Sequence, residues 1–163
     1  MVTILIPTYN SQDSLNLCIK SCIQGCSNLN NIRIIVGDDN IPEINKDVLE
    51  LWKNKIEILS FKQNVGLPHM TNSLVYQVEN DYDWFLLVND DNVFDKDWDI
   101  KLKKYLEKSK RNEGLVVSIN QVEPYPSIFK QFIIEDLGRD PKTFDLNKFW
   151  NFTKNINKLN SFE

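Results

Sequence analysis

The stretch LLVNDDNVFDKDW, Leu86 to Trp98, is the most informative about the fold. An apolar run ends in two consecutive acids, Asp90 and Asp91, which are flanked by Asn89 and Asn92. A run of this length suits a buried strand, and Asp and Asn favour the turn that follows one. Two explanations stay open here: the acids end a strand, or they bind a metal ion and a nucleotide.

The same arrangement of an apolar run and a polar end recurs along the chain. We expect strands over 2–7, 32–37, 56–61, 83–88 and 115–120, and helices over 11–25, 43–54, 67–80 and 96–109. Strands that alternate with amphipathic helices are typical of βαβ crossovers. The sequence therefore predicts an α/β fold, a mostly parallel sheet with helices on both faces.

Length and charge limit the possible partners. The 163 residues suit one domain, and no linker indicates a second. With 23 acids against 19 scattered bases, we expect no nucleic-acid partner. No apolar run is long enough to cross a bilayer, and the apolar start is too short for a secretory signal. We expect a soluble, cytoplasmic protein, in which the acceptor pattern at Asn151 is a chance match.

Three cysteines, Cys18, Cys22 and Cys26, recur every four residues in the first predicted helix. Their spacing suits neither a disulfide framework nor a metal motif, which would need a fourth ligand or a C-x-x-C pair. We expect small, half-buried thiols on the side of the helix that faces the sheet.

Polar loops follow three of the predicted strands, and parallel sheets bind ligands where their strands end. The loops contain Thr8, Tyr9 and Asn10; Asp38, Asp39 and Asn40; and Asn89, Asp90, Asp91 and Asn92. Tyr9 can stack on a base, and Asp38 or Asp39 can accept the N3–H of uracil. Asp91 can hold Mg²⁺ or Mn²⁺ together with phosphate oxygens. Each loop alone could be an ordinary turn, so the prediction depends on all three meeting at one edge.

Several familiar catalytic motifs are absent. The chain has no G-x-x-x-x-G-K-[ST], no G-x-G-x-x-G and no G-x-S-x-G, and His69 is its single histidine. The glycine-rich phosphate cradles of P-loop and dinucleotide-binding enzymes are therefore missing, and histidine-dependent triads are improbable. A metal ion would have to neutralise the phosphates instead.

Four motifs together resemble glycosyltransferase family 2, whose members are inverting enzymes of the GT-A fold. ILIPTYN, IRIIVGDDN, KQNVGLPHMTN and DWFLLVNDDNVFDKDW are similar to the family's vsVIIPtYN, eIIVVDDgS, NxGxxxARN and yilfLDdDdxlxpdW. Their order and spacing match from about Val2 to Leu106. The resemblance implies a nucleotide-sugar-binding half over 1–106 and a short acceptor-side and helical segment over 107–163 of a single domain.

The resemblance also implies roles for individual residues. A nucleotide-sugar site would include Pro7, Thr8, Tyr9, Asp38, Asp39, Asn64, Gly66, Asn89 and Asp90. In it, Pro7 and Tyr9 would surround the base and Asp39 or Asp38 would accept its N3–H. Asp90 would bind the ribose or the sugar, and Asp91 would bind Mn²⁺ or Mg²⁺.

Two positions depart from the family pattern. Asn89 stands where the family usually has the first acid of D-x-D, so metal binding would depend mainly on Asp91. Thr71 stands where the family often has an Arg or Lys facing the diphosphate. The missing positive charge could be supplied by His69 or by the final segment.

The family's catalytic base is an acid located after the sheet, and IIEDLG offers Glu135 and Asp136. The base would deprotonate an acceptor hydroxyl as its oxygen attacks the anomeric carbon. The pair could instead end a turn before Gly138. We keep both explanations.

The segment from Pro124 ends in a predicted amphipathic helix that contains Phe149, Trp150, Phe152, Ile156 and Leu159. This helix could pack over the sheet or lie on a membrane surface. The Q-x-x-R-W segment of the family is absent, so we expect a compact or truncated member.

Three functions stay open. The first is a metal-dependent inverting glycosyltransferase that moves a sugar from a nucleotide diphosphate donor, for which we expect a UDP-sugar, to a hydroxyl of a saccharide or another acceptor. The second is a non-catalytic nucleotide-sugar-binding or assembly module with the same fold. The third and weaker one is a sugar nucleotidyltransferase.

Overall fold

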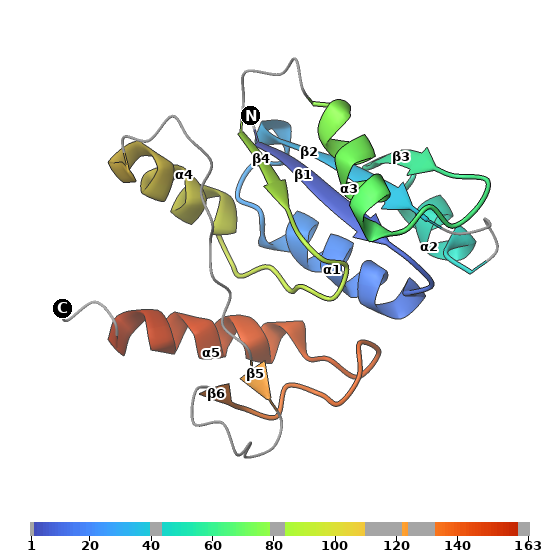
Figure 1. Ribbon diagram of the computed structural model, residues 1–163. Coiled ribbons are helices and arrows are strands. Elements are labelled where there is room, and N and C mark those ends of the chain that lie inside the picture. Colours follow the sequence, from blue (N-terminus) through green and yellow to red (C-terminus); the bar gives the residue numbers. More distant parts are fainter. Residues whose placement is uncertain (1, 40–43, 79–83, 110–121, 124–132, 160–163) are drawn as a thin grey trace. The chain divides into compact units, whose positions relative to one another are not determined.

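The computed structural model describes residues 2–39, 44–78, 84–109, 122–123 and 133–159 (Figure 1). The chain divides into two compact units, residues 1–94 and 95–163, and each is described by itself. The first unit contains β1 (Val2–Thr8), α1 (Gln12–Gly25), a 3₁₀ turn (Leu29–Asn31), β2 (Ile32–Asp38), α2 (Lys46–Trp52), β3 (Glu57–Ser60), α3 (Leu67–Tyr76) and β4 (Trp84–Leu87). The second unit contains α4 (Trp98–Ser109), β5 (Val122–Glu123), β6 (Ile133–Ile134) and α5 (Leu146–Leu159).

A four-stranded sheet forms the centre of the first unit. Its order is β3-β2-β1-β4, and every neighbouring pair is parallel. Figure 1 shows α3 on one face of the sheet and α1 with α2 on the other. The predicted α/β class with helices on both faces is confirmed. The strand order reverses between β1 and β4, which is where open parallel sheets bind ligands.

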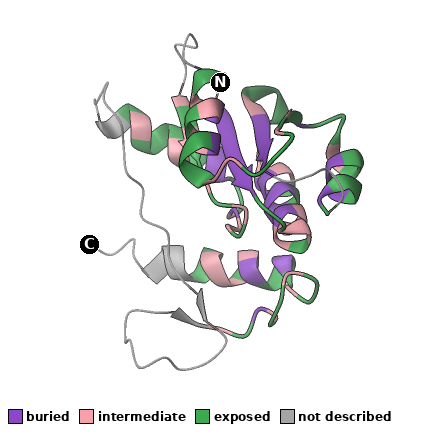
Figure 2. Ribbon diagram, turned by 45° about the vertical axis from the view of Figure 1, so that its right-hand side comes forward, coloured by how far each residue is buried: buried purple, intermediate pink, exposed green. Residues whose placement is uncertain are grey.

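The two faces of the sheet bury alternate residues of β1, as expected for a strand covered on both sides. On one face Leu5 and Ile35 pack with Met70 and Leu74 of α3. Because side chains alternate, Ile4 and its neighbour Ile6 point to the other face, and both are fully buried. In Figure 2 the central strands are accordingly the most continuously buried part of this unit.

Gly37 lets α3 lie close to β2. A Cβ atom at this position would come within 2.3 Å of the Met70 sulfur and 3.0 Å of the Leu74 side chain. Any larger residue would push α3 away from the sheet. The glycine before the acid pair is therefore a packing requirement that fixes α3 against the strand ends.

The helices begin and end slightly differently from the prediction. α2 covers 46–52 rather than 43–54, because Asn45 is its N-cap residue and residues 40–43 lie outside the described part. α3 ends at Tyr76 rather than at residue 80. Ser11 precedes α1 as predicted, but its hydroxyl donates to the Tyr9 carbonyl rather than capping the helix.

The second unit contains the predicted final helix. Asp145 caps α5 by accepting the Lys148 N–H at 2.9 Å, and the rings of Phe144 and Phe149 lie 5.7 Å apart. The short parallel pair of β5 and β6 was not predicted. The predicted strand 115–120 and the side chains of Ile156 and Leu159 lie outside the described residues, so the membrane-surface and sheet-packing alternatives for this helix stay predictions.

None of the described helices combines the length and the apolar character that crossing a membrane requires.

Candidate functional site

A cavity of about 270 Å³ lies at the carboxyl ends of β1 and β4, where the strand order reverses. Three chain segments that are distant in sequence meet around it. Its walls are Pro7, Thr8, Tyr9, Ser11, Asp39, Leu67, Met70, Asn89, Asp90 and Asp91. Seven of these ten residues were predicted as site residues, from all three polar loops. The expectation that the loops meet at one edge is therefore met by the geometry.

The turn that follows β4 is held from several sides. The Thr8 hydroxyl donates to the Asp90 carboxylate at 2.6 Å. The Asn89 N–H donates to the Asn92 side chain at 3.0 Å, and the Asn89 carbonyl accepts from the Asn92 N–H at 3.2 Å. Asp90 is thus fixed in one orientation at the cavity, while its second oxygen can accept from a ligand hydroxyl.

Behind this turn, α1 contributes the Cys18 thiol. It is fully buried and lies 3.7 Å from the Asn89 carbonyl, to which it donates. Burial, together with the nearby Asp90 and Asp91 carboxylates, raises the pKa of Cys18 far above its usual range. The thiol therefore stays protonated. Cys22 is also fully buried, whereas Cys26 caps the end of α1 and is partly exposed.

Asp91 is the most accessible acid of the site. It is exposed and lines the cavity, and its side chain forms no hydrogen bond or ion pair with the residues that the structure describes. A carboxylate with open lone pairs next to a second carboxylate suits a hard cation that completes its shell with phosphate and water. Within those same ranges, no group of three or more His, Cys, Asp or Glu side chains could hold a metal alone. The residues present therefore fit a metal site that phosphate and water complete, rather than one in which protein side chains supply every ligand.

Asp39 joins the end of β2 to the start of α3. Its two carboxylate oxygens accept the N–H groups of Val65 and Gly66 at 2.6 and 2.8 Å. Gly66 has a φ of 81°, which favours glycine, and it precedes the first residue of α3. Each Asp39 oxygen keeps a lone pair for a donor in the cavity.

Asp38 is placed differently from its neighbour. It is fully buried, it does not line the cavity, and its carboxylate accepts from the Asn45 amide at 2.8 Å. Of the two acids proposed to accept a base N–H, the geometry therefore brings Asp39 to the cavity and Asp38 to the core behind it.

Tyr9 stands at the rim of the cavity, with 52 % of its surface exposed. Asn10, which follows it, has a φ of 53°, and the Tyr9 carbonyl accepts from Ser11 at 3.1 Å. This tight turn holds the backbone while the ring stays accessible. An exposed aromatic ring beside a polar cavity is suited to stacking on a flat ligand.

Four residues of the third motif have different places. Gly66 and Asn64 do not line the cavity, although Gly66 binds Asp39 and shapes its wall. His69 is exposed and meets Phe61 edge to face at 5.7 Å, and Thr71 is partly exposed. Neither His69 nor Thr71 lines the cavity. The structure therefore does not bring His69 to the place where it could supply the positive charge that is missing at Thr71.

Sequence reasoning missed three wall residues, Ser11, Leu67 and Met70. Leu67 and Met70 lie three positions apart at the start of α3, so they share one face of the helix. The spacing shows that the two residues share a face, but no signal in the sequence shows that this face reaches the cavity. Met70 is also buried against the sheet.

The two acids considered as a base, Glu135 and Asp136, lie in the second unit. Lys148 pairs with the Glu135 carboxylate at 2.7 Å and also donates to the Asp136 carbonyl at 2.6 Å. The Asp136 carboxylate accepts the Gly138 N–H at 3.3 Å and is exposed. Asp136 is therefore the less engaged carboxylate of the pair.

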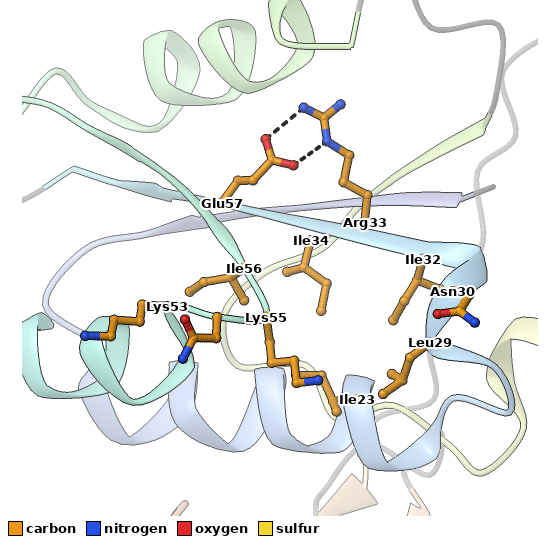
Figure 3. Close-up of a pocket in the computed structure, with 11 residues that line it drawn as sticks. Ile23, Leu29, Asn30, Ile32, Arg33, Ile34, Lys53, Lys55, Ile56 and Glu57 are labelled. Atoms are coloured by element: carbon orange, nitrogen blue, oxygen red, sulfur yellow. Dashed lines mark hydrogen bonds and ion pairs between the residues drawn. The ribbon is translucent and has the colours of Figure 1, made fainter.

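A second cavity of about 390 Å³ lies at the opposite end of the sheet, near the amino ends of β2 and β3 (Figure 3). Isoleucines line its floor, and Arg33 is tied to Glu57 by two bonds of 2.7 and 2.8 Å. Lys53 pairs with Glu50. Its charges are largely neutralised, and it is not at the ligand-binding end of a parallel sheet.

Comparison with known proteins identifies the family of the chain. The model of glycosyl transferase family 2 matches residues 3–158. The chain belongs to this family. The resemblance predicted from the four motifs is confirmed.

Two curated relatives match only with part of their length. The chain is 28 % identical over 166 residues to the processive diacylglycerol beta-glycosyltransferase of Mycoplasma genitalium, covering 98 % of the chain and 46 % of that protein. It is 25 % identical over 122 residues to the teichoic acid poly(glycerol phosphate) polymerase of Staphylococcus epidermidis, covering 73 % of the chain and 16 % of that protein. The chain thus spans about half of the first relative and less of the second.

Solved structures match the fold. S. aureus TarS aligns with a TM-score of 0.57 and 19 % identity, over 66 % of this chain and 19 % of that one. TarS 1-349 in complex with UDP-GlcNAc aligns with a TM-score of 0.56 and 18 % identity, over 66 % of this chain and 31 % of that one. The predicted GT-A-type fold is confirmed.

Proposed function

We propose that this chain is the donor-binding part of a metal-dependent inverting glycosyltransferase that uses a UDP-sugar. The observation that carries the proposal is the cavity whose walls combine Tyr9, Asp39, Asp90 and Asp91. Membership of the family supports sugar transfer, and the UDP-GlcNAc and UDP complexes of TarS support UDP as the nucleotide.

Each wall residue can serve one part of such a donor. Tyr9 would stack on uracil, and Asp39 would accept its N3–H through a lone pair not used by the backbone. Asp90, oriented by Thr8, would accept a ribose or sugar hydroxyl. Asp91 would hold Mn²⁺ or Mg²⁺, which would neutralise charge on the departing diphosphate.

The chemical step needs a base on the acceptor. The acceptor oxygen would form a bond to the anomeric carbon as the bond from that carbon to the diphosphate oxygen breaks. Attack from the opposite face inverts the configuration. We assign Asp136 to take the hydroxyl proton, because Lys148 already occupies Glu135. In this scheme residues 1–106 bind the donor and 107–163 serve the acceptor side, within one domain.

Calorimetry with UDP and Mn²⁺ tests the donor site. We expect binding that a chelator weakens and that Asp91→Ala reduces by at least about tenfold, equivalent to about 1.4 kcal/mol. Asp47→Ala, an exposed acid on α2, is the matched control and leaves binding as in the wild type. If neither the chelator nor Asp91→Ala changes the UDP affinity, the proposed metal site is wrong.

Transfer assays test the base separately. Asp136→Asn keeps UDP affinity and lowers transfer by about 10²- to 10⁴-fold, while Glu135→Gln has the smaller effect. A parallel loss of UDP binding and transfer in Asp136→Asn would instead show a structural residue.

One observation favours the binding module as a second candidate. The wall residues among those that the structure describes all lie between Pro7 and Asp91, within the first unit. A chain that binds UDP with Mn²⁺ but neither transfers nor hydrolyses the sugar would support this function. Turnover by the isolated chain excludes it.

A further inference from the structure

Two buried side chains behind the cavity, those of Asp38 and Asn45, each have an oxygen without a hydrogen-bond donor among the described residues. Asp38 and Asn45 are both fully buried, and the Asn45 amide Nδ2 donates to Asp38 Oδ1 at 2.8 Å. The remaining oxygens, Asp38 Oδ2 and Asn45 Oδ1, have no donor among the residues that the structure describes. Buried polar atoms are nearly always paired, so this double absence requires an explanation.

A single proton removes both deficits. An ionised carboxylate offers only acceptors, whereas a carboxylic acid offers one donor and one acceptor side by side. A carboxamide has the complementary edge. In such a pair the amide N–H donates to one carboxyl oxygen, as Asn45 Nδ2 does to Asp38 Oδ1, and the acid donates the proton on its other oxygen to the amide oxygen, which closes a ring of two hydrogen bonds. Turning the amide over would exchange the contacts but would supply no second donor.

The surroundings of Asp38 disfavour a charge. Its register partners on the neighbouring strands, Thr8 and Ser60, are neutral. Burial raises the pKa of Asp38 and the adjacent Asp39 raises it further, while the bond from Asn45 acts in the opposite direction and is outweighed. Asp39 is the one charged group that acts on Asp38 within the described ranges.

We propose that Asp38 is a neutral carboxylic acid in the folded protein at neutral pH, and that its ring with Asn45 positions Asp39 at the cavity. Asp38 ends β2 and its carbonyl accepts the Phe61 N–H at 3.2 Å, while Asn45 caps α2. Asn45 precedes α2 and its carbonyl, not its side chain, accepts the Leu49 N–H at 2.9 Å, so the ring joins the strand end to the start of the next helix and fixes the backbone from which Asp39 extends. Asp38 is a positioning residue, and Asp39 is the acid that reaches the cavity wall.

Carbon-13 NMR of aspartate-labelled protein tests the protonation directly. The Asp38 carboxyl signal, assigned by its absence in Asp38→Asn, is expected at the position of a neutral acid at neutral pH. Unfolded aspartates ionise near a pH of about 3.9. A signal at the carboxylate position at neutral pH overturns the proposal.

Urea unfolding tests the ring, because Asp38→Asn replaces it by an amide pair with the same two bonds. We expect its midpoint at neutral pH to equal or exceed that of the wild type. Asp38→Leu, which breaks the ring, has a lower midpoint, and Asp47→Asn is the control for an exposed acid. If Asp38→Asn unfolds as readily as Asp38→Leu, or fails to fold, Asp38 acts as a carboxylate and the proposal is wrong.

The positioning role is tested by UDP binding, which rests on the proposed function. Asp38→Leu is expected to weaken binding, and Asp38→Asn to restore it to within about twofold, since an intact ring holds Asp39 as before. If Asp38→Asn and Asp38→Leu lose binding equally, the ring does not position Asp39. If the wild type itself does not bind UDP, the proposed function fails, while the NMR and unfolding results still decide the protonation.

Discussion

The two acid pairs of the first unit have the same sequence form and different physical situations. Asp38 is the last residue of β2 and Asp39 follows it, whereas Asp90 and Asp91 lie in the turn after β4. In the first pair, Asp38 is fully buried and Asp39 is 3 % exposed. In the second pair, Asp90 is partly exposed and Asp91 is exposed. Consecutive acids at strand ends therefore do not form one kind of site.

The partners of the pairs explain this difference. Asp39 is held by two backbone N–H groups, so its place depends on the turn that starts α3. Asp90 is held by one side-chain hydroxyl, and Asp91 has open lone pairs. The first pair is suited to holding the cavity wall in shape, and the second pair is suited to binding and releasing a ligand of the cavity. The following changes test that distinction, from the largest expected effect to the smallest.

Asp39→Asn should have the largest effect on folding. An amide keeps one acceptor oxygen, but its NH₂ group would face the second backbone N–H that the carboxylate now accepts. One partly buried N–H would lose its partner, and we expect the free energy of unfolding to fall by about 2 kcal/mol. Urea denaturation measures this change.

The control for this experiment is Asp47→Asn, which alters an exposed acid without such partners and should change stability by less than about 0.5 kcal/mol. An equally small change in Asp39→Asn would mean that the two backbone bonds contribute little. The contrast between the acid pairs would then lose its basis.

Thr8→Val should have a smaller effect, directed at the other pair. The substitution keeps the shape of the side chain and removes the hydroxyl that donates to Asp90 at 2.6 Å. We expect a loss of about 1 kcal/mol in stability and a several-fold weaker UDP affinity. Thr8→Ser retains the hydroxyl and should preserve the affinity. If the valine variant binds UDP as tightly as the serine variant, Asp90 does not need to be oriented.

The sequence predicted the layers of the fold and most of the cavity wall. Period and capping signals located the first four strands, and the rule for parallel sheets indicated the edge to inspect. It could not separate Asp38 from Asp39, because they are neighbouring acids at one strand end and only the three-dimensional path brings Asp39 rather than Asp38 to the cavity. The alternation of strand side chains does not extend reliably into the loop beyond.

The wall contributed by α3 was also beyond sequence reasoning. Met70 packs in the core and reaches the cavity because Gly37 allows α3 to lie close to β2. A core residue becomes a wall residue through close packing, which a pattern of apolar positions does not report. The parallel pair of β5 and β6 is only two residues per strand, too short for a period to be recognised.

The smallest effect concerns Asp95, an acid in the second unit whose pKa is shifted in the direction opposite to that of Asp38. Burial alone would raise the pKa of Asp95, but bonds from Lys101, Thr153 and the Lys96 N–H together lower it. Its stabilising contribution is therefore present above the pKa of the unfolded chain, about 3.9, and is lost as the pH falls through the lower folded value.

Asp95→Asn should remove this loss of stability at acidic pH. It should also lower stability at neutral pH by less than about 1 kcal/mol, because the Lys101 partner is exposed. Thermal unfolding between acidic and neutral pH measures both effects, and a variant that still loses stability over the same acid range as the wild type would show that Asp95 is not the group responsible.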